Sequence, residues 1–300
     1  MINADITDQQ FAVLSNGMRL HYVSAGRRGQ PLLLCLHGFP EFSGAWDAQL
    51  QAFGETHFVV APDLRGFNLS SMPVEVAAYK ARHIVEDLQL LIAYLGYQDC
   101  ILLAHDWGGA IAWNIVIGLP DLVQKLIIIN APHPYLFMQA LTSDPVQQAA
   151  STYMNWLRAP GAEVALAKNE FALMDRFFTA VEPADGRWFD AAVRQRYHAV
   201  WQRGVQGALN YYRASPLYPP TAADPAPLAL AQRMNEADFR VTVPTRVIWA
   251  TADTALPVTL LDGLDRFVDD LHITRIEGAS HWVVHEQPAL INKLIVDFLN

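Results

Sequence analysis

The sequence predicts an α/β fold: a mostly parallel, doubly wound sheet with an inserted helical segment. Short apolar stretches typical of strands buried in a parallel sheet recur along the chain and alternate with stretches of helical periodicity. The alternation stops for about a hundred residues of helical, aromatic-rich sequence and then resumes, which indicates an insertion within one sheet. A pair of alternating segments near the amino terminus predicts a β-hairpin.

The hairpin is expected over Phe11 to Val23, with Asn16-Gly17 as its two-residue turn. A helix is expected over Ala78–Leu95, because apolar residues recur there at helical spacing and Gly96 supplies a stop signal. Six buried parallel strands are expected at Pro31–Leu36, Phe58–Ala61, Cys100–Leu103, Leu126–Ile129, Arg246–Ala250 and His272–Ile276.

The helical insertion begins after Asn130-Ala131-Pro132-His133-Pro134 and ends before Val241. We therefore expect a discontinuous core domain over residues 1–134 and 237–300 and a helical cap domain over residues 135–236. The proline-rich stretch Pro216 to Pro227 is expected to be an exposed loop.

Composition describes a globular protein, with 52% hydrophobic and 17% charged residues. The formal charge of −9 disfavours nucleic acid and anionic membranes as partners. Cys35 and Cys100 each lie in an expected strand and are interpreted as core residues. Neither a signal peptide nor an apolar run long enough for a membrane span is expected, so a cytoplasmic location is the default. The oligomeric state stays open.

A carboxylate occupies the position where a strand is expected to turn sharply into a helix. The spacing Ala104-x-Asp106-x-Gly108 matches a nucleophile elbow, in which small residues let the strand and the helix approach closely. A carboxylate that attacks a saturated carbon forms an alkyl ester, which water can cleave, whereas a serine would form a stable ether. Asp106 therefore indicates epoxides or alkyl halides as substrates. The alternative for this residue is a salt-bridged aspartate at an ordinary turn.

An acid and a histidine follow two later strands, in the order expected for a hydrolytic triad. Asp253 ends the segment Trp249-Ala250-Thr251-Ala252-Asp253, and His281 follows Gly278-Ala279-Ser280. His281 would deprotonate water, and Asp253 would orient its ring. Each residue taken alone could be structural.

The segment Leu36-His37-Gly38-Phe39-Pro40 follows the first buried strand and is a candidate oxyanion hole. The amides of Phe39 and Trp107 could converge on the oxyanion, and His37 is included among the substrate-binding candidates. A His-Gly pair is also a common turn. His105, beside the nucleophile, is interpreted as a packing or hydrogen-bonding residue.

Along nearly its whole length the chain resembles the epoxide hydrolases of the α/β-hydrolase fold. The resemblance is carried by Asp106, Asp253 and three motifs, His37-Gly38-Phe39-Pro40-Glu41, Asp63-Leu64-Arg65-Gly66-Phe67-Asn68-Leu69-Ser70 and Gly278-Ala279-Ser280-His281-Trp282. It implies two cap tyrosines that hydrogen-bond the epoxide oxygen. The motif Asn210-Tyr211-Tyr212-Arg213 assigns Tyr212, and the Pro160-Gly161 pair, whose proline comes seven residues after it, assigns Tyr153.

Dehalogenases of the same scaffold are the nearest alternatives. Haloalkane dehalogenases typically carry Asn or Glu where Phe39 stands, and haloacetate dehalogenases usually carry arginines just after the nucleophile, where this chain has none. A non-catalytic ligand-binding protein of this fold is the alternative from another class. Epoxide hydrolysis is favoured, with a small apolar epoxide and water as substrates and with no metal or organic cofactor required.

Overall fold

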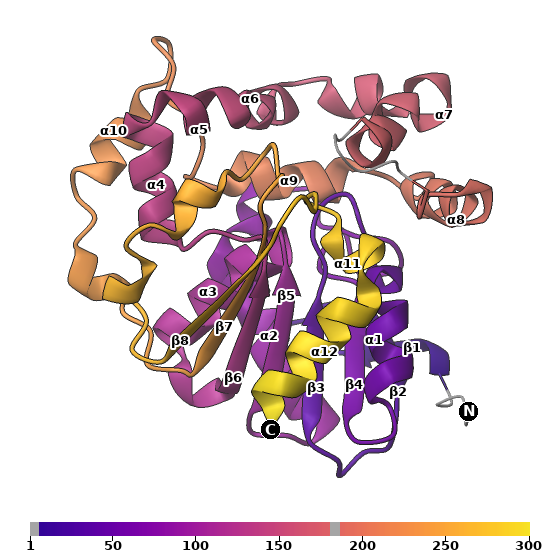
Figure 1. The fold of residues 1–300 in the computed structure, drawn as a ribbon. Helices are drawn as coiled ribbons and strands as arrows, with labels where there is room; N and C mark the ends of the chain where they lie inside the picture. Colours follow the sequence, from indigo (N-terminus) through magenta and orange to yellow (C-terminus); the bar gives the residue numbers. More distant parts are fainter. Residues whose placement is uncertain (1–5, 181–186) are drawn as a thin grey trace.

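The computed structural model, described over residues 6–180 and 187–300, is built around an eight-stranded sheet (Figure 1). The strand order is β1-β2-β4-β3-β5-β6-β7-β8; β2 pairs antiparallel with β1 and β4, and the remaining pairs are parallel. The strands are β1 (Ile6–Val13), β2 (Arg19–Ala25), β3 (Leu32–Leu36), β4 (Phe58–Pro62), β5 (Cys100–His105), β6 (Val123–Ile129), β7 (Thr245–Ala250) and β8 (Leu271–Ile276). The mostly parallel, doubly wound sheet predicted from the sequence is confirmed.

The amino-terminal hairpin is confirmed, but its turn differs from the expected two-residue turn. The Leu14 amide donates to the Met18 carbonyl at 2.8 Å, so three residues form the loop. Gly17 has φ +84° and its amide donates to the Leu14 carbonyl. A three-residue loop with a left-handed residue at its last position is a common hairpin connection. An Asn-Gly pair alone does not distinguish the two loop lengths.

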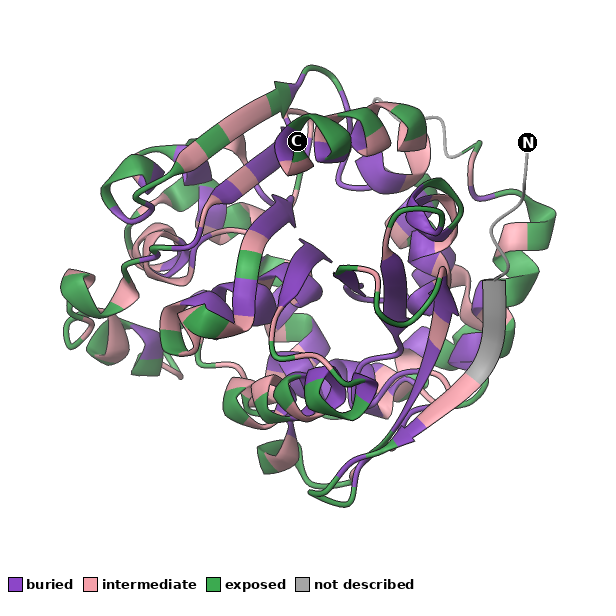
Figure 2. Cartoon of the chain, turned by 90° about the horizontal axis from the view of Figure 1, so that it is seen from below, coloured by how far each residue is buried: buried purple, intermediate pink, exposed green. Residues whose placement is uncertain are grey.

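Two layers of helices cover the sheet because its strands are apolar on both faces. Leu33 and Cys35 of β3 pack with α1 (Asp47–Phe53) and α12 (Pro288–Leu299). Leu32, Leu34 and Leu36 face the opposite layer, formed by α2 (Ala81–Leu95) and α3 (Trp107–Gly118). Figure 2 shows the resulting pattern, with buried strands at the centre and exposed helix faces outside. Cys35 and Cys100 are free, buried thiols in opposite layers, as expected for core residues.

The predicted helix over Ala78–Leu95 is confirmed from Ala81 onward. A 3₁₀ turn, Val76–Tyr79, occupies its expected start. Gly96 adopts φ +92° directly after the helix, where a residue without Cβ meets the left-handed conformation at little cost.

The long insertion between β6 and β7 is helical, and Figure 1 shows it above the carboxyl ends of the parallel strands. We propose that it forms a cap unit over residues 135–236, on a core unit of residues 1–134 and 237–300. Its helices are α4 (Pro134–Ser143), α5 (Pro145–Ala150), α6 (Thr152–Arg158), α7 (Ala162–Thr179, interrupted by non-helical backbone at 168–171), α8 (Ala191–Trp201), α9 (Gln206–Ala214) and α10 (Ala226–Ala231).

The proline-rich stretch is less exposed than expected. Tyr218 within it is buried, and the Arg158 guanidinium lies 3.5 Å from its ring centroid. The loop then ends early, because α10 begins at Ala226. Proline content identifies a loop, but it does not show that an aromatic side chain anchors the loop to the cap.

Across residues 6–180 and 187–300, no helix combines the length and the apolar character that crossing a membrane requires. The expectation that no signal peptide is present depends on residues 1–5, which lie outside the described residues.

Candidate active site

Asp106 lies in a strained turn between β5 and α3. Its backbone adopts φ +52° and ψ −122°, a region that non-glycine residues rarely occupy and that is typical of functional sites. The turn is sharp enough to bring α3 against β3, and a Cβ on Gly108 would lie 2.3 Å from the Leu36 carbonyl oxygen. The small residue expected two positions after Asp106 is therefore required, because the backbone at Gly108 packs closely against the backbone at Leu36.

The loop after β3 holds one oxygen of the Asp106 carboxylate. The Phe39 amide donates to Asp106 Oδ1 at 2.7 Å. A Cβ on Gly38 would lie 2.3 Å from the same oxygen, so only glycine permits this approach. Trp107 is the first residue of α3, where amide groups have no partner within the helix. The two amides predicted to form an oxyanion hole thus both belong to residues next to Asp106, and the Phe39 amide contacts its carboxylate.

His281 lies between two carboxylates. Its Nδ1 is 2.6 Å from Asp253 Oδ2, and its Nε2 is 3.6 Å from Asp106 Oδ2. Asp253 is itself fixed, because the amides of Ala255 and Leu256 donate to its Oδ1 at 2.9 and 3.0 Å. The structure therefore brings together the three residues that the sequence placed after separate strands.

Asn130 completes the support of Asp253 and was not among the predicted site residues. It is fully buried at the end of β6, and its side-chain amide donates to Asp253 Oδ2 at 2.7 Å. Its Oδ1 accepts the Ala250 amide of β7 at 2.9 Å. Asn130 thus ties two strand ends together. Its position directly after an apolar strand was a signal that sequence reasoning could have used, since the nucleophile was recognised in the same way.

The charges around His281 control its protonation. Burial alone would lower the pKa of His281, but the charge and hydrogen bond of Asp253, together with the charge of Asp106, raise it to about 9. Burial likewise tends to raise the pKa of Asp253, yet His281 and the bonds from Leu256 and Asn130 hold it below its usual value. His281 is therefore protonated near neutral pH, and it lies between the Asp253 and Asp106 side chains.

His37, a predicted substrate-binding candidate, joins two loops beside the site. Its ring is fully buried, with Nδ1 donating to the Gly38 carbonyl at 2.9 Å and Nε2 accepting the Leu64 amide at 3.1 Å. Burial lowers its pKa, and this bonding pattern requires the neutral ring. His37 joins the loops after β3 and β4, and thereby positions the neighbouring Phe39.

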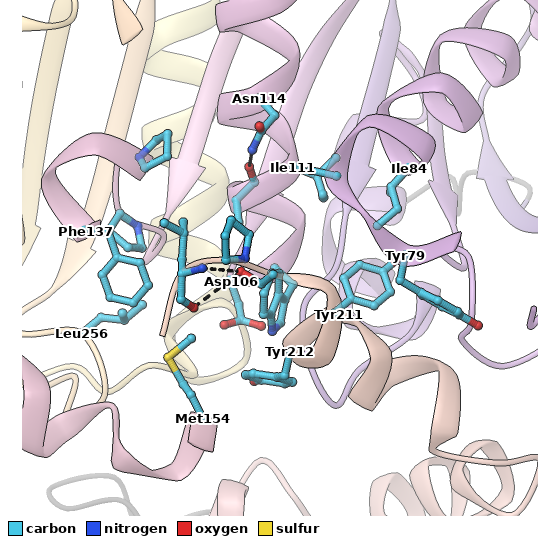
Figure 3. Close-up of a pocket in the computed structure, with 18 of the residues that line it drawn as sticks. Tyr79, Ile84, Asp106, Ile111, Asn114, Phe137, Met154, Tyr211, Tyr212 and Leu256 are labelled. Carbon is cyan, nitrogen blue, oxygen red and sulfur yellow. Dashed lines mark hydrogen bonds between the residues drawn. The ribbon is translucent and has the colours of Figure 1, made fainter. Parts of the chain in front are cut away.

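The cap places two tyrosines over Asp106. Tyr212 of α9 and Tyr153 of α6 line the same space as the nucleophile. Burial raises the pKa of both phenols, and the charge of Asp106 adds to this effect, so both stay protonated and able to donate. Tyr211 differs from its neighbour, because its hydroxyl donates to the Arg65 carbonyl at 2.9 Å. Figure 3 shows Tyr212 beside the nucleophile and Tyr211 next to Tyr79.

Two cavities meet at Asp106. The apolar cavity has a volume of about 300 Å³ and is lined mainly by residues such as Ile111, Phe137, Met154 and Leu256 (Figure 3). The histidine-side cavity has a volume of about 260 Å³ and is lined by residues that include Phe39, Arg176, Asp253, His281 and Trp282. Asp106, Tyr153 and Tyr212 line both. A molecule that reacts with Asp106 can therefore extend substituents in two directions.

Glu41 forms a buried network behind the site, and sequence reasoning identified it only as part of a motif. Its carboxylate contacts His105 Nδ1 at 3.3 Å and His285 Nε2 at 2.6 Å, and it accepts the Tyr197 hydroxyl of α8 at 2.9 Å. Burial opposes its ionisation, but the two histidines hold its pKa well below the usual value. His105 Nε2 donates to the His281 carbonyl at 2.9 Å. His105 is therefore a hydrogen-bonding residue, in agreement with its interpretation.

No group of three or more His, Cys, Asp or Glu side chains suited to holding a metal ion is found within the described part of the chain.

Comparisons with known proteins identify the family of this chain. The family described as alpha/beta hydrolase fold matches residues 31–288. Human epoxide hydrolase 4 is 35% identical over 294 residues, which cover 96% of this chain and 77% of that protein. A protein of the AB hydrolase superfamily from Bacillus subtilis is 32% identical, with 96% of both chains covered.

Solved structures give the same result. A mutant of an epoxide hydrolase from Bacillus megaterium superimposes with a TM-score of 0.87 at 34% identity, covering 97% of this chain and all of that one. A second mutant of that enzyme, complexed with its product (R)-3-[1]naphthyloxy-propane-1,2-diol, has a TM-score of 0.85 at 32% identity, with 97% and 100% covered.

The sheet, the elbow and the family match define an α/β-hydrolase fold. Within that fold, the chain belongs to the epoxide hydrolase family.

Proposed function

We propose that this protein hydrolyses epoxides to vicinal diols through a covalent ester on Asp106. The observation that carries the proposal is the position of this carboxylate: Tyr153 and Tyr212 of the cap line both cavities that it lines, and His281 Nε2 lies 3.6 Å from its Oδ2. One point is therefore surrounded by a nucleophile, by a source of protons for the leaving oxygen and by a base for water.

In the first step Asp106 Oδ2 attacks an epoxide carbon, and the bond between that carbon and the ring oxygen breaks. Negative charge develops on the ring oxygen, which accepts a proton from a tyrosine. The apolar cavity keeps competing water away from the phenols, so their hydrogen bonds act in a medium of low dielectric. The cationic His281 returns a proton to the tyrosine and becomes neutral.

In the second step neutral His281 removes a proton from water, which attacks the carboxyl carbon of the ester. The amides of Phe39 and Trp107 stabilise the oxyanion. When the intermediate collapses, the departing diol oxygen takes the proton from His281. The carboxylic acid left on Asp106 then protonates His281, which restores the resting charges. One water is consumed: one of its hydrogens ends on the departing diol oxygen, and the other replaces the His281 proton that reached the ring oxygen through the tyrosine.

The charges of the site favour this order of events. Asp106 contributes to the raised pKa of His281 while it is ionised. Formation of the ester removes that charge, and the pKa of His281 then falls toward the range in which the ring is a base. His281 is therefore an acid before alkylation and a base after it.

Dehalogenation by the same carboxylate is the second candidate. Phe39 occupies the position where a halide-binding amide or carboxyl side chain would be expected, and its ring packs edge-on against Tyr212 and Phe177. A halide ion needs no proton, so two phenols directed at the leaving group favour an alkoxide over a halide.

Two measurements test the proposal. A glycidyl ether that corresponds to the naphthyloxy diol bound by the Bacillus megaterium relative, supplied in large excess over protein, should be converted to diol over many turnovers. A non-catalytic binding protein would produce none. A single turnover in heavy-oxygen water should then place the label in the Asp106 carboxylate and leave the first diol unlabelled. Label in the first diol would instead show direct attack by water.

A further inference from the structure

We propose that Arg176 is a specificity-determining residue that recognises an anionic group on the substrate. This inference rests on the proposed function and narrows the class of substrates. They are epoxides with a substituent, called the arm below, that extends into the histidine-side cavity and ends in a carboxylate. Among the described residues that line the two cavities at Asp106, Arg176 is the one Lys or Arg.

The position of Arg176 is fixed relative to the reacting groups. It lies in the last turn of α7, and the carbonyl of the next residue, Phe177, accepts the indole Nε1–H of Trp282 at 2.7 Å. Trp282 follows His281 directly and lines the same cavity. The cap helix that carries the cation is therefore attached to the loop that carries the histidine.

The guanidinium is available for a ligand. Arg176 is an exposed residue. Over residues 6–180 and 187–300, its guanidinium makes no hydrogen bond or ion pair with another side chain. The adjacent acid, Asp175, does not compete for it, because Arg194 and His198 bind the two Asp175 oxygens at 2.6 and 2.7 Å. An arginine can bind a carboxylate with two parallel hydrogen bonds, which gives direction as well as attraction.

The cavity has room for a substrate arm and for the water that His281 activates. Its volume is about 260 Å³, whereas a single water needs roughly 10–15 Å³. Asp106 and Asp253 line the same cavity and repel an anionic arm, and the cationic His281 there is already paired with both of them. Arg176 offsets that repulsion at the exposed side, so the charged end of the arm lies away from the epoxide. The substrate therefore needs a spacer between the epoxide ring and the carboxylate. Short α-halo acids have no such spacer, so they do not belong to this class of substrates.

The test compares epoxides that share one skeleton and differ only at the end of the arm, which carries a carboxylate, a neutral carboxamide or a quaternary ammonium group. For each protein, kcat/KM is measured for the series, with spacers of graded length. In the wild type we expect the carboxylate to exceed the carboxamide by roughly 3- to 10-fold, since an exposed ion pair contributes modestly. The difference should be in KM and should decrease with added salt.

Variants assign the effect to one side chain. Arg176→Gln should remove the preference for the carboxylate, Arg176→Lys should retain part of it, and Arg176→Glu should transfer it to the ammonium epoxide. Arg203→Gln is the matched control, because Arg203 is an exposed cap residue outside both cavities and loses the same charge. The carboxylate preference should survive this control.

Two outcomes would overturn the inference. If the neutral epoxide is hydrolysed but the carboxylate preference is the same in wild type and Arg176→Gln, Arg176 does not recognise the anion and only this inference fails. If no member of the series is hydrolysed by the wild type, the proposed function itself fails.

Discussion

The two halves of the site are held in place by different means. On the core side, Asp106, Asp253 and His281 each follow a β-strand, and short hydrogen bonds from neighbouring backbone or side chains fix their polar atoms. On the cap side, Tyr153 and Tyr212 project from helices; their rings pack against each other, and the Tyr212 ring packs against Trp107. The core thus presents fixed charges, whereas the cap presents neutral hydroxyls on a packed surface.

This difference corresponds to a division of the chemistry. In the proposed mechanism the core half supplies the nucleophile and the groups that hydrolyse its ester, so its loss should block the second step. The cap half would supply protons to the leaving oxygen, so its loss should slow the first step. Variants on the two sides should therefore produce opposite kinetic signatures, and four measurements test this separation.

The largest effect is expected for His281→Gln. Without a base for water, the ester on Asp106 should accumulate, and steady-state turnover should fall by roughly 10²- to 10⁴-fold. Mass spectrometry of the intact protein after incubation with an epoxide should show the added mass of one substrate. His198→Gln, which removes a cap histidine outside both cavities, should remain unmodified at steady state. A His281→Gln protein that loses turnover but carries no adduct would contradict the division.

Tyr212→Phe is expected to have the next largest effect. Removing one of two proton donors should slow alkylation by roughly 10- to 100-fold and leave the ester hydrolysis step nearly unchanged. Rapid-quench measurement of adduct formation and decay separates the two rates. Tyr211→Phe is the matched control, because the Tyr211 hydroxyl donates to a backbone carbonyl and does not face the nucleophile. Equal slowing in both variants would assign the effect to packing and not to the phenol.

Asn130→Gly tests whether the core half depends on its supporting hydrogen bonds. Glycine retains the positive φ of this position and removes the amide that holds Asp253. We expect ester hydrolysis to slow by about 10-fold, and the unfolding free energy to fall by about 1–3 kcal/mol because the Ala250 amide loses its buried acceptor. Alkylation should change little. If alkylation slows and hydrolysis does not, Asn130 does not act through Asp253.

The core half of the site could be predicted from the sequence, because parallel strands place their carboxyl ends at one edge of the sheet. A polar residue after a buried apolar run therefore marks a position in space, which is how Asp106, Asp253 and His281 were found. The same rule applies to Asn130, but it was not used there because an asparagine in a loop has many ordinary explanations.

The cap half was less predictable, because helical periodicity shows which face is buried without showing what that face contacts. Tyr211 and Tyr212 are adjacent and both buried, and only the resemblance to a family singled out one of them. Arg176 gave no sequence signal, since an arginine near the end of a helix is common. Its role depends on how α7 packs against the loop after β8, which is a tertiary relationship.

The smallest effect is the pH dependence of stability that the core charges produce. The pKa of His281 is about 9 in the folded protein and near its ordinary value of 6.5 in the unfolded chain. The folded state therefore binds its proton more tightly, so the stabilisation is fully present below pH 6.5 and is lost as the pH rises toward 9. Thermal unfolding monitored from pH 6 to pH 9.5 should show a Tm that decreases across this window.

The cap provides the reference for this measurement. In Asp253→Asn the largest interaction that raises the His281 pKa is removed, so the decrease in Tm across the window should become shallower even though the variant is less stable overall. In Tyr212→Phe the slope should match the wild type, because the phenol stays neutral over the whole range. A slope that is unchanged in Asp253→Asn would mean that the buried charges at the strand ends are not coupled. In that case the proposed contrast between a charged core half and a neutral cap half would be wrong, because it depends on this coupling.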